Sequence, residues 1–71
     1  MFIVDRNQFI AWTQGILLKR NSDGNCFVVN ETVCEEATKR LEQGEEVGFM
    51  IDGELKSKMK IQDGQYVEVL I

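Results

Sequence analysis

From residue 47 onward, hydrophobic and polar positions alternate with a period of two, as in β-strands with one buried face. The alternation predicts strands over residues 47–51, 54–61 and 66–71. Asp52-Gly53 and Asp63-Gly64 separate these strands and match the two-residue turns of β-hairpins. We therefore predict a three-stranded antiparallel meander. In its middle strand, one face carries Leu55, Met59 and Ile61 and the other carries Glu54, Lys56, Lys58 and Lys60; in its third strand, Val67, Val69 and Ile71 are in phase.

Residues 32–43 show the longer period of an amphipathic helix. One narrow apolar stripe contains Val33, Cys34, Ala37 and Leu41. Thr32 and Glu35 match a capping box, and Asn30 is an alternative N-cap. Gly44 stands where a left-handed C-cap residue belongs. This helix is predicted to cover one face of the sheet and to expose its other side to water.

The first half of the chain gives a less uniform pattern. Residues 2–4 and 26–29 are predicted as strands, and residues 8–20 fit two patterns. In the helical pattern, Asp5 and Gln8 take capping positions, and Phe9, Trp12 and Ile16 share one face. We favour strands, with Gly15 at a bulge, because aromatic and branched residues suit strands and glycine costs a helix interior about 1 kcal/mol.

These elements predict an α+β fold in a single domain over residues 1–71, since the chain is too short for two cores. The predicted architecture is a mainly antiparallel sheet of four to six strands with one helix, at about 32–43, packed on one face. If residues 8–14 are helical, two helices cover a smaller sheet instead.

The net charge of the chain argues against nucleic acid as a partner. Twelve acidic residues against eight basic ones give a formal net charge of −4, which opposes binding to phosphates. Six of the glutamates lie between residues 31 and 46. We interpret them as a solvated helix face, with nucleic-acid mimicry as an alternative.

Candidate catalytic chemistry is sparse. The chain has no histidine, so triads and two-histidine metal sites are excluded, and it has no phosphate-binding glycine motif. Cys26 and Cys34 are too few for a disulfide framework or a structural zinc site, and we expect both to be small core residues. We therefore expect no enzyme, cofactor, metal or small-molecule substrate. Without a membrane-spanning stretch or a signal peptide, we expect a cytoplasmic protein, in the host cytoplasm if it is viral.

Because candidate catalytic and metal sites are lacking, we expect the protein to act by binding another macromolecule through its surface. One helix covers only one side of a sheet, so some apolar side chains should be left exposed as an interaction surface. The favoured hypothesis is a small acidic protein-binding module that regulates or inhibits a larger partner, of the kind found in phages and mobile elements. The alternatives are a structural homodimer or assembly subunit, and a nucleic-acid mimic acting through the acidic helix. The predicted partner-binding residues are Trp12, Ile10, Met50, Tyr66, Glu35, Glu36 and Glu42.

Overall fold

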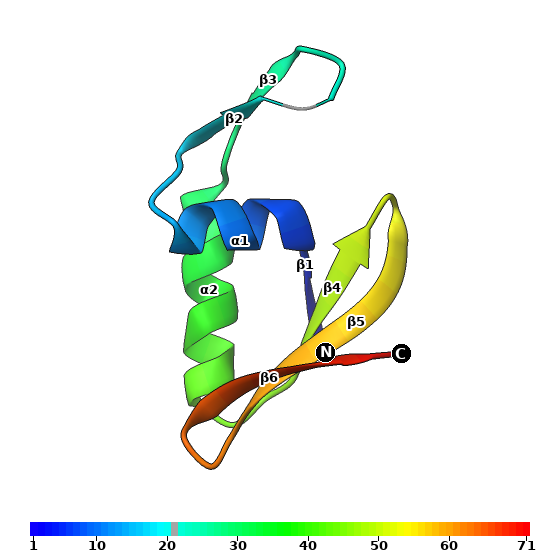
Figure 1. Ribbon diagram of the computed structural model, residues 1–71. Coiled ribbons are helices and arrows are strands. Elements are labelled where there is room, and N and C mark those ends of the chain that lie inside the picture. Colours follow the sequence, from blue (N-terminus) through cyan, green and yellow to red (C-terminus); the bar gives the residue numbers. More distant parts are fainter. Residues whose placement is uncertain (21) are drawn as a thin grey trace.

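A computed structural model describes residues 1–20 and 22–71 and confirms the α+β class (Figure 1). These residues form two helices and six strands. Their order is β1 (Phe2–Asp5), α1 (Arg6–Thr13), β2 (Leu18–Arg20), β3 (Cys26–Val28), α2 (Glu31–Glu42), β4 (Val47–Ile51), β5 (Glu54–Gln62) and β6 (Gln65–Leu70).

The main sheet of the described residues has four strands in the order β1-β4-β5-β6. The predicted meander is confirmed, because β4, β5 and β6 pair antiparallel. Its turns have the positive φ angles that a type I′ turn requires, with Asp52 at 51° and Gly53 at 80° in the first. β1 pairs parallel with β4, which makes the sheet mixed. β2 and β3 form a separate two-stranded hairpin that projects from one end of the molecule (Figure 1).

The favoured strand interpretation of residues 8–20 is wrong for its first part, which belongs to α1. Asp5 is the N-cap, and its side chain accepts a hydrogen bond from the Gln8 amide at 3.1 Å. Gly15, expected at a strand bulge, lies just beyond the helix with φ 79°. The amide of Ile16 donates to the carbonyl of Ala11 at 2.9 Å, which completes a Schellman motif. Gly15 therefore ends this helix and is not part of its interior.

The predicted helix at 32–43 is confirmed as α2. Asn30, not Thr32, is its N-cap, and the Asn30 side chain accepts from the Val33 amide at 3.2 Å. Gly44, with φ 86°, closes the C-terminal end as predicted. Among the described residues, neither helix combines the length and the apolar composition that crossing a membrane requires.

Both helices pack on the same face of the sheet and form the core with it. Phe49 of β4 lies at the centre of this core, with its ring 5.4 Å from the ring of Phe9 in α1. Leu41 of α2 and Val47 of β4 are also fully buried. The covered part of the sheet is β1, β4 and the adjoining part of β5, so β6 extends beyond the helices.

A β-bulge changes the predicted faces of β5. Ser57 lies opposite Phe49, but the next pair is Leu55 opposite Met50, so Lys56 is an extra residue. Leu55 is thereby turned to the face away from the helices. There its side chain lies over Gly48, where an added Cβ would come within 2.8 Å of the Leu55 Cδ1 atom. The prediction that Leu55 shares a face with Met59 and Ile61 is therefore wrong.

The two cysteines are free thiols in different environments. Cys34 is fully buried in α2, as expected, and burial together with the nearby charge of Glu31 raises the pKa of its thiol. Cys26 is exposed, so its predicted place in the core is wrong: it belongs to the projecting β2–β3 hairpin.

We expect only Cys26 to react when the native protein is treated with iodoacetamide at neutral pH. Cys34 should react only after unfolding, because it is buried and its raised pKa keeps the thiol protonated. Intact mass spectrometry should show one adduct in buffer and two in concentrated urea. Two adducts at equal rates in buffer would contradict the burial of Cys34.

Candidate protein-binding groove

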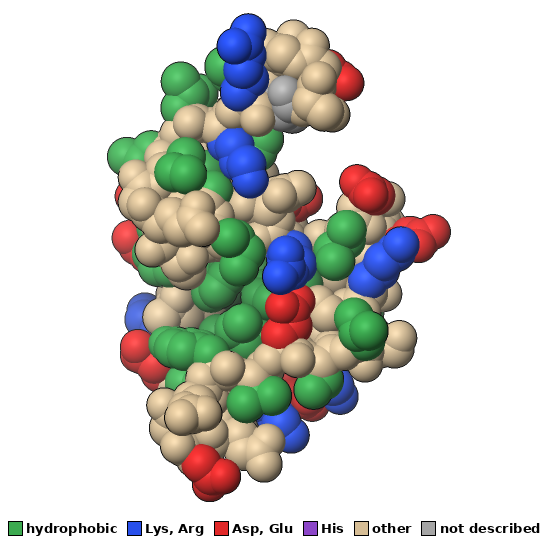
Figure 2. All heavy atoms as spheres, viewed as in Figure 1, with side chains coloured by type: hydrophobic (Ala, Val, Ile, Leu, Met, Phe, Trp, Pro, Cys, Tyr) green, Lys and Arg blue, Asp and Glu red, His purple; other side chains and the backbone are tan. Residues whose placement is uncertain are grey.

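An open groove lies between the two helices and the uncovered end of the sheet. Its volume is about 500 Å³. Figure 2 shows hydrophobic side chains gathered on this face in the hollow between α1 and β6. The lining residues are Phe9, Ile10, Trp12 and Thr13 from α1, Thr38 from α2, Met59 from β5 and Tyr66 from β6.

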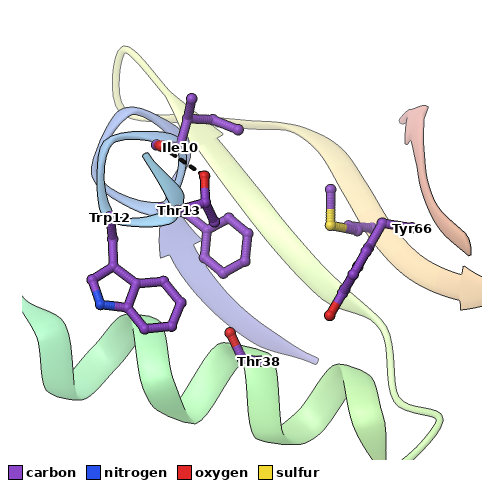
Figure 3. A pocket seen from close by; sticks show the side chains of 7 residues that line it. Ile10, Trp12, Thr13, Thr38 and Tyr66 are labelled. Carbon is purple, nitrogen blue, oxygen red and sulfur yellow. Dashed lines mark hydrogen bonds between the residues drawn. The ribbon is translucent and has the colours of Figure 1, made fainter. Parts of the chain in front are cut away.

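Each wall of the groove has a different origin (Figure 3). The wall from α1 contains Trp12, which is half-buried. Its ring packs against the ring of Phe9 at an interplanar angle of 46°, with the two centroids 6.1 Å apart. The opposite wall contains Tyr66, which is 56% exposed because no helix covers β6. Thr38 and Thr13 donate their hydroxyl hydrogens to carbonyls of their own helices, at 3.1 Å and 2.7 Å. The groove therefore presents mainly apolar surface.

A polar network connects the two walls at one end of the sheet. Arg6, the first residue of α1, donates from Nε and Nη2 to the Glu68 carboxylate of β6 at 2.9 Å and 3.1 Å. The fully buried Ser57 hydroxyl donates to the same carboxylate at 2.6 Å. The hydrogen bond from Arg6 is the largest influence that lowers the pKa of Glu68, and the same contact raises the pKa of Arg6. This network joins the start of α1 to β6.

This network was not predicted from the sequence. Arg6 and Glu68 are far apart in the sequence, so no local pattern joins them. The one signal was Ser57, a small polar residue at an inward position of a predicted strand. A polar group at such a position requires a hydrogen-bond partner.

Acidic side chains flank the α2 side of the groove. Glu35 and Glu42 lie three residues before and four residues after Thr38, so they share its side of the helix. Glu36 has a different role, because Arg40 donates to its carboxylate at 3.0 Å. The side of α2 next to the groove therefore carries the carboxylates of Glu35 and Glu42, with Lys39 between them.

The structure brings together three of the predicted partner-binding residues, Ile10, Trp12 and Tyr66, in the groove. It separates Met50, which lines a small depression of about 70 Å³ with Arg6, Asn7 and Ile51. The predicted acidic residues Glu35, Glu36 and Glu42 all lie on α2 outside the groove lining. The other four lining residues were not predicted, because their convergence depends on how α1 and α2 pack on the sheet: Phe9, Thr13, Thr38 and Met59.

Within residues 1–20 and 22–71, no group of three potential metal ligands comes together. Comparison with known family models, curated proteins and solved structures gives no match to this chain.

Proposed function

We propose that this chain is a small protein-binding module that holds an apolar segment of a larger protein and thereby regulates or inhibits it. The observation that carries the proposal is the groove itself, which places Ile10, Trp12 and Tyr66 around one hollow. Tryptophan and tyrosine are the side chains most often found at the energetic centres of protein interfaces. The groove has the size of a site for two or three apolar side chains.

The acidic side chains near the groove indicate which charges the bound segment should carry. Glu35 and Glu42 lie on the flank next to Thr38, and the whole chain has a net charge of −4. We therefore expect the bound segment to have apolar anchors next to lysine or arginine. Such charges would speed association and lose their effect at high salt. Mimicry of nucleic acid has less support, because Arg40 neutralises Glu36 within the acidic helix.

A displayed library of random peptides tests this function. Selection on the immobilised wild-type protein should enrich peptides with two or three apolar anchors and adjacent basic residues. Tyr66→Ala should weaken the selected peptides at least tenfold, because it removes one wall of the groove. Tyr66 is more than half exposed, so the variant should keep its fold. Titrations followed by the fluorescence of Trp12, the only tryptophan, measure the affinity.

Val28→Ala is the matched control, because it trims an exposed apolar side chain on the projecting hairpin, outside the groove. Its affinity for the selected peptides should equal that of the wild type. The double variant Glu35→Lys/Glu42→Lys should bind the same peptides several-fold more weakly. The proposal fails if no peptide is enriched, or if the enriched peptides bind Tyr66→Ala as tightly as the wild type.

A further inference from the structure

The outer edge of β6 is an unprotected strand edge. β6 is last in the sheet order and pairs with β5 alone among the described residues. Proteins usually block such an edge with lysine, proline or a bulge. The sequence of β6, Gln-Tyr-Val-Glu-Val-Leu, contains neither lysine nor proline, and its pairing with β5 is regular. Its one charged residue, Glu68, already has its carboxylate bound by Arg6 and Ser57.

The register identifies which backbone groups of β6 are available. The amide of Ile71 donates to the carbonyl of Lys56 at 3.0 Å, so Ile71 faces β5. Backbone groups in an antiparallel ladder alternate in direction. Val67 and Val69 therefore bond to β5, and Tyr66, Glu68 and Leu70 direct their amides and carbonyls to the free edge.

We propose that two copies of this chain pair antiparallel through β6, with Glu68 on the two-fold axis, and form one continuous sheet of eight strands. This register places Tyr66 opposite Leu70 of the second copy on the helix side of the sheet. It places Val67 opposite Val69 on the other side. All three outward-directed residues of each strand then find backbone partners.

The side chains of the strand support a second copy as the occupant, because the strand is complementary to itself in this register. Leu70 is 85% exposed and Tyr66 56% exposed, and each would cover the other across the axis. The two Glu68 carboxylates meet at the axis, but each has its own Arg6 at 2.9 Å to balance its charge. In the neighbouring register centred on Val67, Leu70 would face Gly64 and stay uncovered.

The dimer would also complete the groove, a consequence that rests on the proposed function. Leu70 of the second copy would lie beside Tyr66, on the same side of the joined sheet. It would pack against the exposed side of the Tyr66 ring and restrict the motion of β6 at the groove. The two grooves would open on one side of the eight-stranded sheet, so the dimer would present two binding sites to a partner.

Sedimentation velocity over a wide range of concentrations tests the dimer. We expect a reversible monomer–dimer equilibrium in the micromolar range, since a single strand pair buries less surface than a standard interface. Leu70→Lys should weaken the dimer at least tenfold, and Val28→Lys, at a similarly exposed strand position elsewhere, should not. Leu70→Pro should also abolish it, because the lost amide points outward and serves no bond within one copy.

Disulfide cross-linking tests the proposed register of the two β6 strands. The variants carry Cys26→Ser, because the exposed Cys26 could otherwise form disulfides itself. Val67 and Val69 of the two copies form a pair with Cα atoms about 4.5 Å apart, which a disulfide can bridge. Mild oxidation of a mixture of Val67→Cys and Val69→Cys should give the mixed dimer, and either variant alone should stay uncross-linked. A wild type that remains monomeric at millimolar concentration, or cross-linking of either variant alone, overturns the proposal. Peptide titration of the wild type separates the two proposals, because a wild type that stays monomeric and still binds the selected peptides rejects only the dimer.

Discussion

Replacing Leu41 with alanine should destabilise the protein by about 2–5 kcal/mol. Leu41 is 0% exposed and packs between α2 and the sheet, so its loss would leave a cavity in the only core of the described residues. A chain of 71 residues has a total stability of roughly 4–11 kcal/mol. We therefore expect urea denaturation, followed by circular dichroism, to show a large drop in the midpoint or a protein that is partly unfolded in buffer.

Leu18→Ala is the matched control for this result. It removes the same atoms from β2, where the leucine is 61% exposed. Its free energy of unfolding should stay within about 0.5 kcal/mol of the wild type. Equal losses from Leu41→Ala and Leu18→Ala would contradict the packing of α2 described above.

Replacing Glu68 with glutamine should cost about 1 kcal/mol at pH 7 and reduce the pH dependence of stability. The hydrogen bond from Arg6 lowers the pKa of Glu68 below its ordinary value of 4.5. The stabilisation is therefore complete above pH 4.5 and is lost as the pH falls toward the lower pKa of the folded state. The carboxylate is partly exposed to solvent, which limits the magnitude.

Urea denaturation at pH 7 and at pH 3 measures this effect. The wild type should lose more stability between these two pH values than Glu68→Gln does. Glu35→Gln, a change at an exposed position of α2, should follow the wild type. Identical pH profiles for the wild type and Glu68→Gln would show that the Arg6–Glu68–Ser57 network does not contribute to stability.

The sequence was sufficient to predict those elements whose structure is determined by neighbouring residues. The meander depends on alternation and on two Asp-Gly turns, and α2 depends on its apolar stripe, on Asn30 and on Gly44. The same local signals were present for α1, from the Asp5 cap to Gly15. Gly15 was misinterpreted because it was placed inside a longer element, whereas it stands in the same relation to α1 as Gly44 does to α2.

Features that depend on pairing over long distances were not predictable from local patterns. Alternation places Leu55 with Met59, and only the register of β5 against β4 shows that Lys56 is an extra residue between them. The groove has a similar origin. Ile10, Trp12 and Tyr66 were each predicted as contact residues, but their meeting depends on how α1 crosses α2 beside β6.

The parallel pairing of β1 with β4 has a consequence for how the chain folds. Phe2 pairs with Val47, and the segment between these two residues contains both helices and the projecting hairpin. The β1–β4 ladder can therefore form only after this long segment has folded so that the two strands meet. The contacts among β4, β5 and β6 need only short loops and should form early. β1 leaves the ribosome before its neighbour β4 and is thus expected to be the last strand of the sheet to pair, and until then the nascent chain exposes the edge of β4.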